Sequence, residues 1–183
     1  MSEELLIRQA APTLAGIKTG SLFPCPYEDR QRLISDVRRL NRILTPKGLC
    51  LLPLRLSARR ALLYLYRPAQ LRSDLQNELA AELLRQAGYS GGNCARCVAE
   101  LIRRFQDGGE FPHEVGLFLS YPPEDVRGFI RNGAEGCKCA GLWKVYGDEE
   151  KAKRLFDSYR KCTKIYCALW RAGSQLERLA VAV

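Results

Sequence analysis

Two apolar runs of strand length, joined by a four-residue polar connection, constrain the fold of this chain more than any other feature. The runs are Leu49–Leu56 and Ala61–Tyr66, with residues 57–60 between them. Successive runs of this kind are typical of a β-hairpin. Pro53 interrupts the first run, and proline cannot donate a hydrogen bond to a strand ladder. We therefore expect an edge position or a bulge at that residue.

Segments with helical periodicity lie on both sides of this hairpin. Their apolar residues recur at spacings of three and four, which predicts one face turned to a core. The predicted helices cover residues 28–44, 68–87, 93–106, 122–132 and 148–170. Asn93 and Asp148 suit N-cap positions, and Gly88 suits a C-cap. Gly91 and Gly92 are expected to break the chain between the second and third of these helices.

Two further strands are predicted, over residues 115–120 and 139–146. Together with the hairpin they would form a small mixed β-sheet of about four strands flanked by helices, which is an α+β fold. The chain has 183 residues and shows no internal repeat and no linker. One hydrophobic core serves a chain of this length efficiently, so we expect a single globular domain over residues 1–183.

Charge and hydropathy favour a cytoplasmic protein. No apolar run approaches the roughly 20 residues that a membrane helix needs, so no membrane segment is expected. The first four residues, MSEE, are acidic where a secretory signal would be basic. Without export, the eight cysteines are expected as free thiols or metal ligands. The net charge of +9 favours anionic partners.

His113 is the only histidine of the chain. An imidazole with a pKa near 6.5 can act as a base or as a ligand at neutral pH. The first hypothesis is a ligand pocket around His113, Glu114, Tyr121, Lys144 and Tyr146. The alternative is that His113 merely hydrogen-bonds a loop, and that Trp143 packs in the core.

Four cysteines could form a metal site. Cys94 and Cys97 lie at a predicted helix start, where the helix dipole and Arg96 would lower the thiol pKa values. Cys137 and Cys139 could complete a tetrahedral zinc or iron–sulfur site. A redox dithiol and unligated thiols are the alternatives, and we expect that the four sulfurs do not converge.

An arginine-rich region supports a different hypothesis. Residues 28–72 contain ten arginines and one lysine against three acids. Arg32, Arg38, Arg39 and Arg42 lie opposite the apolar stripe of the first predicted helix. With Arg59 and Arg60 they could contact nucleic acid or an acidic protein, because arginine matches phosphate and carboxylate geometry. No recognised nucleic-acid motif accompanies them, and a charged stripe is usually a solvated face.

Several blocks of the sequence resemble a known family. They are residues 11–18 (APTLAGIK), 111–119 (FPHEVGLFL), 121–130 (YPPEDVRGFI) and 143–146 (WKVY). These blocks resemble the bacterial domain-of-unknown-function family 3793, whose members are typical of anaerobic Firmicutes and are often encoded near flavodoxin or iron-uptake genes. The family's opening usually has a His-Cys pair where this chain has Gln9 and Ala10. The resemblance implies a redox or iron context, with an acidic redox protein such as a flavodoxin as a partner.

Three functions remain open on the sequence. The first is a cytosolic bacterial accessory or ligand-binding protein of redox or iron metabolism, with its pocket around His113. The second is a basic binding module for nucleic acid or an acidic protein. The third is an enzyme of unknown class that uses His113. Neither a Walker loop nor a dinucleotide fingerprint, nucleophile elbow or metalloprotease motif occurs, which disfavours the standard nucleotide-binding and hydrolase classes. The sequence specifies no cofactor and no catalytic residue.

Overall fold

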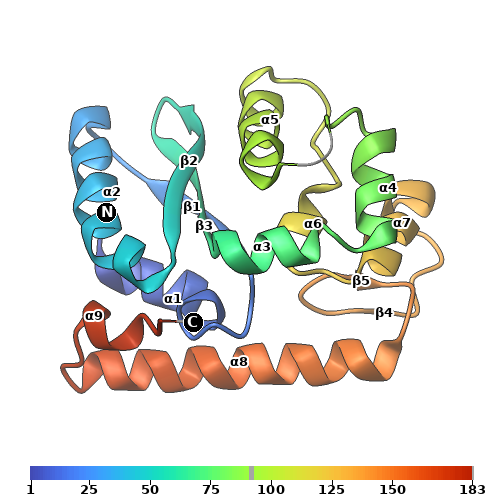
Figure 1. The fold of residues 1–183 in the computed structure, drawn as a ribbon. Coiled ribbons are helices and arrows are strands. Elements are labelled where there is room, and N and C mark those ends of the chain that lie inside the picture. Colours follow the sequence, from blue (N-terminus) through green and yellow to red (C-terminus); the bar gives the residue numbers. More distant parts are fainter. Residues whose placement is uncertain (91–92, 183) are drawn as a thin grey trace.

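A three-stranded antiparallel sheet forms one half of the fold and has helices on both of its faces (Figure 1). The computed structural model describes residues 1–90 and 93–182. Strand β3 (Arg60–Tyr66) lies between β1 (Gly20–Pro26) and β2 (Cys50–Ser57). The predicted hairpin is confirmed, since β2 and β3 pair antiparallel along their whole length. The first strand, β1, is not among the predicted strands.

Both features expected of Pro53 occur. Strand β2 is an edge of the sheet, and its register with β3 shifts between Pro53 and Arg55. An edge strand needs hydrogen-bond donors on one side only, and a bulge leaves one residue unpaired. The edge position and the bulge together accommodate a residue that has no backbone N–H to donate.

The central strand β3 separates two hydrophobic clusters. Leu63 and Leu65 belong to the cluster formed with α1 (Glu3–Leu14) and α2 (Arg30–Leu44). Tyr64 and Tyr66 face the opposite cluster, which α3 to α6 cover. Alternate residues of a strand point to opposite faces, so a strand covered on both faces is apolar throughout. This explains the unbroken apolar run of the second hairpin strand.

Most predicted helices are confirmed. The remaining helices and the 3-10 turn are η1 (Thr45–Lys47), α3 (Pro68–Asp74), α4 (Glu78–Gln86), α5 (Cys94–Gln106), α6 (Val115–Phe118), α7 (Pro123–Asn132), α8 (Glu149–Arg171) and α9 (Leu176–Leu179). Asn93 and Asp148 cap α5 and α8 as predicted. Gly88 follows α4 with a φ of 81°. The expected break at Gly91 and Gly92 lies outside the described residues.

The single helix predicted over residues 68–87 is wrong. The chain forms α3 and α4 instead, with Leu75, Gln76 and Asn77 between them. The side chain of Asn77 accepts a hydrogen bond from the Ala80 amide and so begins a new helix. Asparagine is among the strongest N-caps, and here this local preference overrides the continuous leucine spacing.

The strand predicted over residues 115–120 is also wrong. These residues are buried as expected, but Val115–Phe118 forms the short helix α6. Turn hydrogen bonds hold it, including Val115 N–H to Pro112 O at 3.0 Å and Leu117 N–H to Glu114 O at 3.0 Å. A short apolar run that is buried on all sides has no periodicity to distinguish strand from helix.

Residues 139–146 form two short strands rather than one. They are β4 (Cys139–Ala140) and β5 (Lys144–Val145), which pair antiparallel around a turn. At Gly141 an added Cβ would lie 2.2 Å from the Phe156 ring, so only glycine allows this turn to pack on α8. The α+β class is confirmed, but the strands form two separate antiparallel sheets and no mixed sheet.

The long helix α8 runs along one side of the molecule (Figure 1). Phe156 and Tyr159 near its beginning pack with Trp143 and Val145 in a third hydrophobic cluster. Tyr166 and Trp170 near its end pack against the cluster of α1 and α2. The apolar side chains of α8 are thus divided between two cores. No helix among the described residues is long and apolar enough to cross a membrane.

A buried arginine joins distant segments of the fold. Arg67 directly follows β3 and is 2% exposed. Its guanidinium donates to the carbonyls of Thr13 and Leu14 at the end of α1, each at 2.8 Å. It also donates to Lys47 O at 3.3 Å and to Val181 O at 2.7 Å. One side chain therefore ties the end of α1, the turn before β2 and the C-terminal residues together.

Replacing this arginine tests its structural role. We expect Arg67→Met to lower the free energy of unfolding by about 3–5 kcal/mol, because several buried carbonyls lose their donors. Arg67→Lys should cause a smaller loss, since an ammonium reaches fewer of these carbonyls. Arg72→Met is the matched control on exposed α3 surface and should change stability by less than about 0.5 kcal/mol. Urea denaturation followed by circular dichroism measures all three, and equal effects of Arg67→Met and Arg72→Met would contradict the assignment.

Candidate functional site

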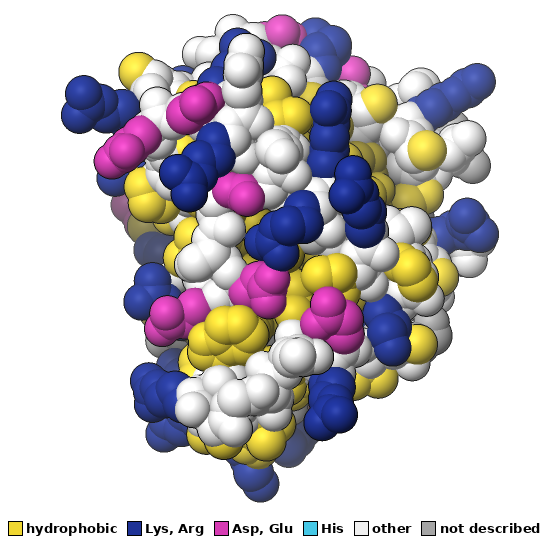
Figure 2. Space-filling model, turned by 90° about the vertical axis from the view of Figure 1, so that its left-hand side faces the viewer, with side chains coloured by type: hydrophobic (Ala, Val, Ile, Leu, Met, Phe, Trp, Pro, Cys, Tyr) yellow, Lys and Arg dark blue, Asp and Glu magenta, His cyan; other side chains and the backbone are white. Residues whose placement is uncertain are grey.

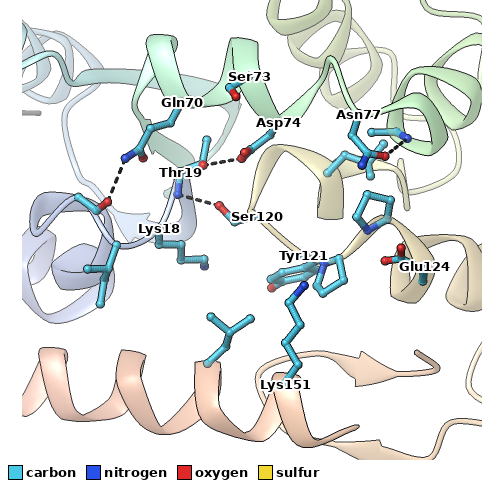
Figure 3. A pocket seen from close by; sticks show the side chains of 17 residues that line it. Lys18, Thr19, Gln70, Ser73, Asp74, Asn77, Ser120, Tyr121, Glu124 and Lys151 are labelled. Atoms are coloured by element: carbon cyan, nitrogen blue, oxygen red, sulfur yellow. Dashed lines mark hydrogen bonds between the residues drawn. The ribbon is translucent and has the colours of Figure 1, made fainter. Parts of the chain in front are cut away.

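A polar cleft of about 630 Å³, here called the Lys18 cleft, lies where several segments of the chain meet. Four segments that are far apart in the sequence surround it (Figure 3). They are the loop between α1 and β1, the residues where α3 gives way to α4, the turn between α6 and α7, and the beginning of α8. The polar side chains of its lining are Lys18, Thr19, Gln70, Ser73, Asp74, Asn77, Ser120, Tyr121, Glu124 and Lys151.

Hydrogen bonds from Thr19 connect three of these segments. The Thr19 amide donates to Ser120 Oγ at 2.7 Å, and the Thr19 hydroxyl donates to Asp74 at 2.5 Å. Ser120 has a φ of 61°, the one positive φ of a non-glycine residue in the described chain. Non-glycine residues held in this region are strained and concentrate at functional sites. The hydrogen bonds therefore hold Ser120 in a strained backbone conformation and give this wall of the cleft a defined geometry.

Burial makes two polar groups of the wall unusual. The pKa of Asp74 is raised by burial, while its hydrogen bond from Thr19 acts in the opposite direction. Gln70 donates from its amide nitrogen to Gly16 O at 2.9 Å, but its Oε1 is buried and has no hydrogen-bond partner among the described residues. Buried acceptors without a partner are rare in folded proteins. Gln70 therefore carries an unpaired acceptor that lies behind the surface of the cleft.

The amine of Lys18 lies between two aromatic rings on the cleft. It lies 5.6 Å from the centre of the Tyr121 ring and 5.7 Å from that of Tyr159. No carboxylate of the described residues forms an ion pair with it. Burial lowers the pKa of Lys18 to about 8. Lys151 rises from α8 toward the same tyrosine, as Figure 3 shows, and it too has no ion-pair partner in the described part of the chain.

A second, mostly apolar pocket of about 260 Å³ contains three of the five residues proposed around His113. His113, Tyr121 and Lys144 line it together with Trp143 and other apolar side chains. The exposed His113 ring packs edge-on against Phe129, with centroids 5.0 Å apart. Tyr121 stacks on Trp143 and lines both hollows, so one aromatic ring separates the two.

The other two proposed pocket residues lie elsewhere. Glu114 is buried and accepts a hydrogen bond from the Tyr89 hydroxyl at 2.9 Å. Arg104 of α5 contacts the same carboxylate at 3.4 Å. Glu114, which follows α5, therefore binds both that helix and Tyr89 in the loop before it. The hydroxyl of Tyr146 donates to Gly133 O, and its ring covers Gly128. Neither residue lines the pocket that His113 shares with Trp143.

The cysteines show no metal geometry in the described residues. No group of three or more His, Cys, Asp or Glu side chains there could hold a metal ion. The lowered thiol pKa values predicted for Cys94 and Cys97 are wrong. Burial raises the pKa of both thiols, and the neighbouring Cys97 raises that of Cys94 further. Apolar surroundings thus outweigh the helix dipole at this position.

The exposed face predicted for Arg32, Arg38, Arg39 and Arg42 is confirmed. Arg59 and Arg60 are exposed as well. On α2, three of these arginines line a shallow groove of about 520 Å³ with Gln31 and Ser35. Glu3 pairs with one, Arg39, at 2.7 Å. Figure 2 shows lysine and arginine side chains spread over this side of the molecule, with fewer acidic side chains between them.

The Lys18 cleft was not among the predicted sites, although one signal for it existed. Lys18 ends the sequence block 11–18, and Tyr121 begins the block 121–130. Both blocks carry the family resemblance, and the structure brings them together on one cleft. By contrast, nothing in the local sequence distinguishes Gln70 and Asp74 from ordinary polar residues of a surface helix.

A substitution at Ser120 tests whether the wall depends on its hydrogen bond. We expect Ser120→Ala to lower the free energy of unfolding by about 1–3 kcal/mol, because the buried Thr19 amide loses its acceptor. Ser120→Gly should cost less, since glycine relieves strain of about 1 kcal/mol at positive φ. Ser73→Ala, on the same cleft but exposed and without a side-chain hydrogen bond, is the control. Equal stability of all three variants in thermal denaturation would refute this account.

Comparison with known proteins gives the chain a family. A family model described as "Protein of unknown function (DUF3793)" matches residues 6–180, which is nearly the whole chain. No curated protein and no solved structure matches significantly. The matched range includes every segment of the Lys18 cleft and of the His113 pocket. The resemblance seen in the sequence is confirmed, and the chain belongs to the DUF3793 family.

Proposed function

We propose that this protein binds a small organic anion in the Lys18 cleft. The observation that carries the proposal is the pair of lysines, Lys18 and Lys151, which approach one cleft without an ion-pair partner among the described residues. Lys151 is exposed, but Lys18 is partly buried, and its ammonium loses hydration that no counter-ion in the protein restores. An anionic group between the two amines would restore it.

The rest of the cleft suits a polar ligand of metabolite size. Its volume of about 630 Å³ lies within the usual range of roughly 300–1,000 Å³ for small-molecule sites. The side chains of Ser73 and Asn77 are exposed on the cleft and can bond polar groups away from the anion. Asp74 accepts a hydrogen bond from Thr19, and Glu124 is exposed to solvent. Neither carboxylate forms an ion pair with the lysines, so their amines are available to an anion.

The hypothesis of a His113 pocket becomes part of this proposal. The pocket lies across Tyr121 from the cleft and is lined mainly by apolar side chains. His113, Tyr121 and Lys144 would hold an apolar group there, while Glu114 and Tyr146 would act through the structure around them. The family resemblance supports a cytosolic accessory role in redox or iron metabolism for such a binding protein.

Charge-removing substitutions test the anion site. We expect Lys18→Met and Lys151→Met each to weaken the binding of malonate or inorganic phosphate about tenfold, because a charged hydrogen bond contributes roughly 1.5–3 kcal/mol. Lys164→Met removes the same charge from an exposed position on α8 and should leave binding unchanged. Binding is measured by NMR titration, in which the Thr19 and Ser120 amide signals should shift.

The pH dependence provides a second readout. Because the pKa of Lys18 is about 8, anion affinity should fall as the pH rises through 8, well below the pKa of an ordinary lysine. Lys18→Arg keeps its charge and should abolish this fall. Anion binding that is equally strong in Lys18→Met, Lys151→Met and Lys164→Met would place the anion outside the cleft and refute the proposal.

The arginine groove on α2 supports a second candidate function, the binding of an acidic surface. Arg38 and Arg42 line it without ion-pair partners among the described residues, and guanidinium groups suit phosphates and carboxylates. The candidates are nucleic acid and an acidic protein such as a flavodoxin. A groove formed by one exposed helix face would bind either mainly by charge and without sequence preference.

The salt dependence of binding tests this second function. We expect labelled duplex oligonucleotides to bind weakly, with log K falling by about 0.9 per phosphate neutralised for each tenfold rise in salt. Changing Arg32, Arg38, Arg39 and Arg42 to Gln should abolish the binding. Binding that survives both high salt and these substitutions would refute the electrostatic account. Absence of binding at low salt would exclude nucleic acid, and an acidic protein would then be titrated in the same way.

A further inference from the structure

The surroundings of Lys18 suit covalent chemistry as well as ion pairing. Its amine lies over the faces of Tyr121 and Tyr159, on the wall of a cleft that small molecules can enter. The charged groups that share the cleft are Asp74, Glu124 and Lys151, and neither carboxylate forms an ion pair with Lys18. A lysine that is desolvated and free of a carboxylate partner is the usual form of a nucleophilic amine.

We propose that Lys18 forms an imine with the carbonyl carbon of a ligand bound in the cleft. The proposal rests on the proposed function and specifies its ligand: an aldehyde or ketone that also carries an anionic group, such as a 2-oxo acid. The anionic group would lie toward Lys151, and the carbonyl carbon would lie at Lys18.

A substantial part of Lys18 is already the neutral amine near physiological pH. With a pKa of about 8, about a quarter of the amine is unprotonated at pH 7.5, against about one part in a thousand for an ordinary lysine. The two tyrosine faces favour the ammonium form, but at 5.6 and 5.7 Å they lie near the 6 Å limit of this interaction. Burial therefore dominates, and the amine is available for attack.

The reaction is balanced within the cleft. The lone pair of Lys18 Nζ attacks the carbonyl carbon, a C–N bond forms as the C=O π bond breaks, the nitrogen gives up one proton and the carbonyl oxygen takes one up, which gives a neutral carbinolamine. Its hydroxyl then takes up a further proton and leaves as water, while the nitrogen lone pair forms the C=N bond and the nitrogen gains the positive charge of the protonated imine. Because the charge of Lys18 is retained, the ion pair with the anionic group of the ligand persists after the reaction.

Groups that can supply and accept these protons lie on the same wall. The pKa values of Tyr121 and Asp74 are both raised by burial, so the phenol stays protonated and the carboxylate becomes a better proton acceptor. Ser120 and Thr19 complete the polar surface beside them, and Thr19 already bonds Asp74. The imine is thus expected to form and hydrolyse reversibly.

Reductive trapping tests the proposal. The full-length protein is incubated with pyruvate and sodium cyanoborohydride at pH 7.5, and the labelled lysines are mapped by peptide mass spectrometry. We expect labelling of Lys18 at least tenfold above that of exposed Lys164, and competition by malonate, which has the anionic groups but no reactive ketone. Acetone, a ketone without an anionic group, should label Lys18 much less. Equal labelling of Lys18 and Lys164 by pyruvate would overturn the imine.

The Lys18→Arg variant separates the imine from simple anion binding. Arginine keeps the positive charge but cannot form this imine. Lys18→Arg should therefore bind malonate more tightly than Lys18→Met in the NMR titration, while both variants lose the pyruvate adduct at residue 18. If malonate binds the wild-type protein in the cleft and pyruvate is not trapped at Lys18, the imine is refuted and the anion site stands. If neither malonate nor pyruvate binds in the cleft, both proposals fail.

Discussion

The hydrogen bonds of buried Arg67 hold together the segments on which the rest of the structure depends. A guanidinium keeps its proton in a protein, so its donors are permanent, and here backbone carbonyls rather than a carboxylate accept them. Removing such a charge from water costs several kcal/mol, which only good geometry offsets. Because Arg67 bonds the last carbonyls of α1, it fixes where that helix ends. The loop that carries Lys18 begins there.

The sequence was sufficient for those elements whose cause is local. The hairpin of β2 and β3, the bulge at Pro53 and the caps of α5 and α8 all follow from residue types at defined spacings. The elements predicted wrongly are those whose cause is tertiary. Val115–Phe118 is apolar because every side of it is buried, which removes the periodicity that reveals a helix. The turn at Gly141 depends on Phe156, which follows it by 15 positions in the chain.

The candidate site shows the same division more clearly. His113 attracts notice because imidazole chemistry is recognisable from residue type alone, and the structure leaves that ring exposed beside an apolar pocket. Lys18 has no such signature, because its properties come from burial and from Tyr121 and Tyr159, which lie about 100 and 140 positions away. Only the coincidence of two family-like blocks, 11–18 and 121–130, contained information about the cleft. The sequence singled out both blocks, but it did not predict that they lie side by side on one cleft.

Helix α8 packs on two separate parts of the fold, one near each of its ends. Its 23 residues span about 34 Å, with the Tyr166 end seated on the core of α1 and α2 and the Phe156 end on the small β4–β5 sheet. Lys151 lies near the Phe156 end of the helix and lines the cleft. A tilt of about 5° about the Tyr166–Trp170 end would displace Lys151, which lies roughly 25 Å from it along the helix, by about 2 Å. Trp170 contributes no atom to the cleft, yet it packs the far end of the same rigid helix, so the position of Lys151 depends on the packing at both ends of α8.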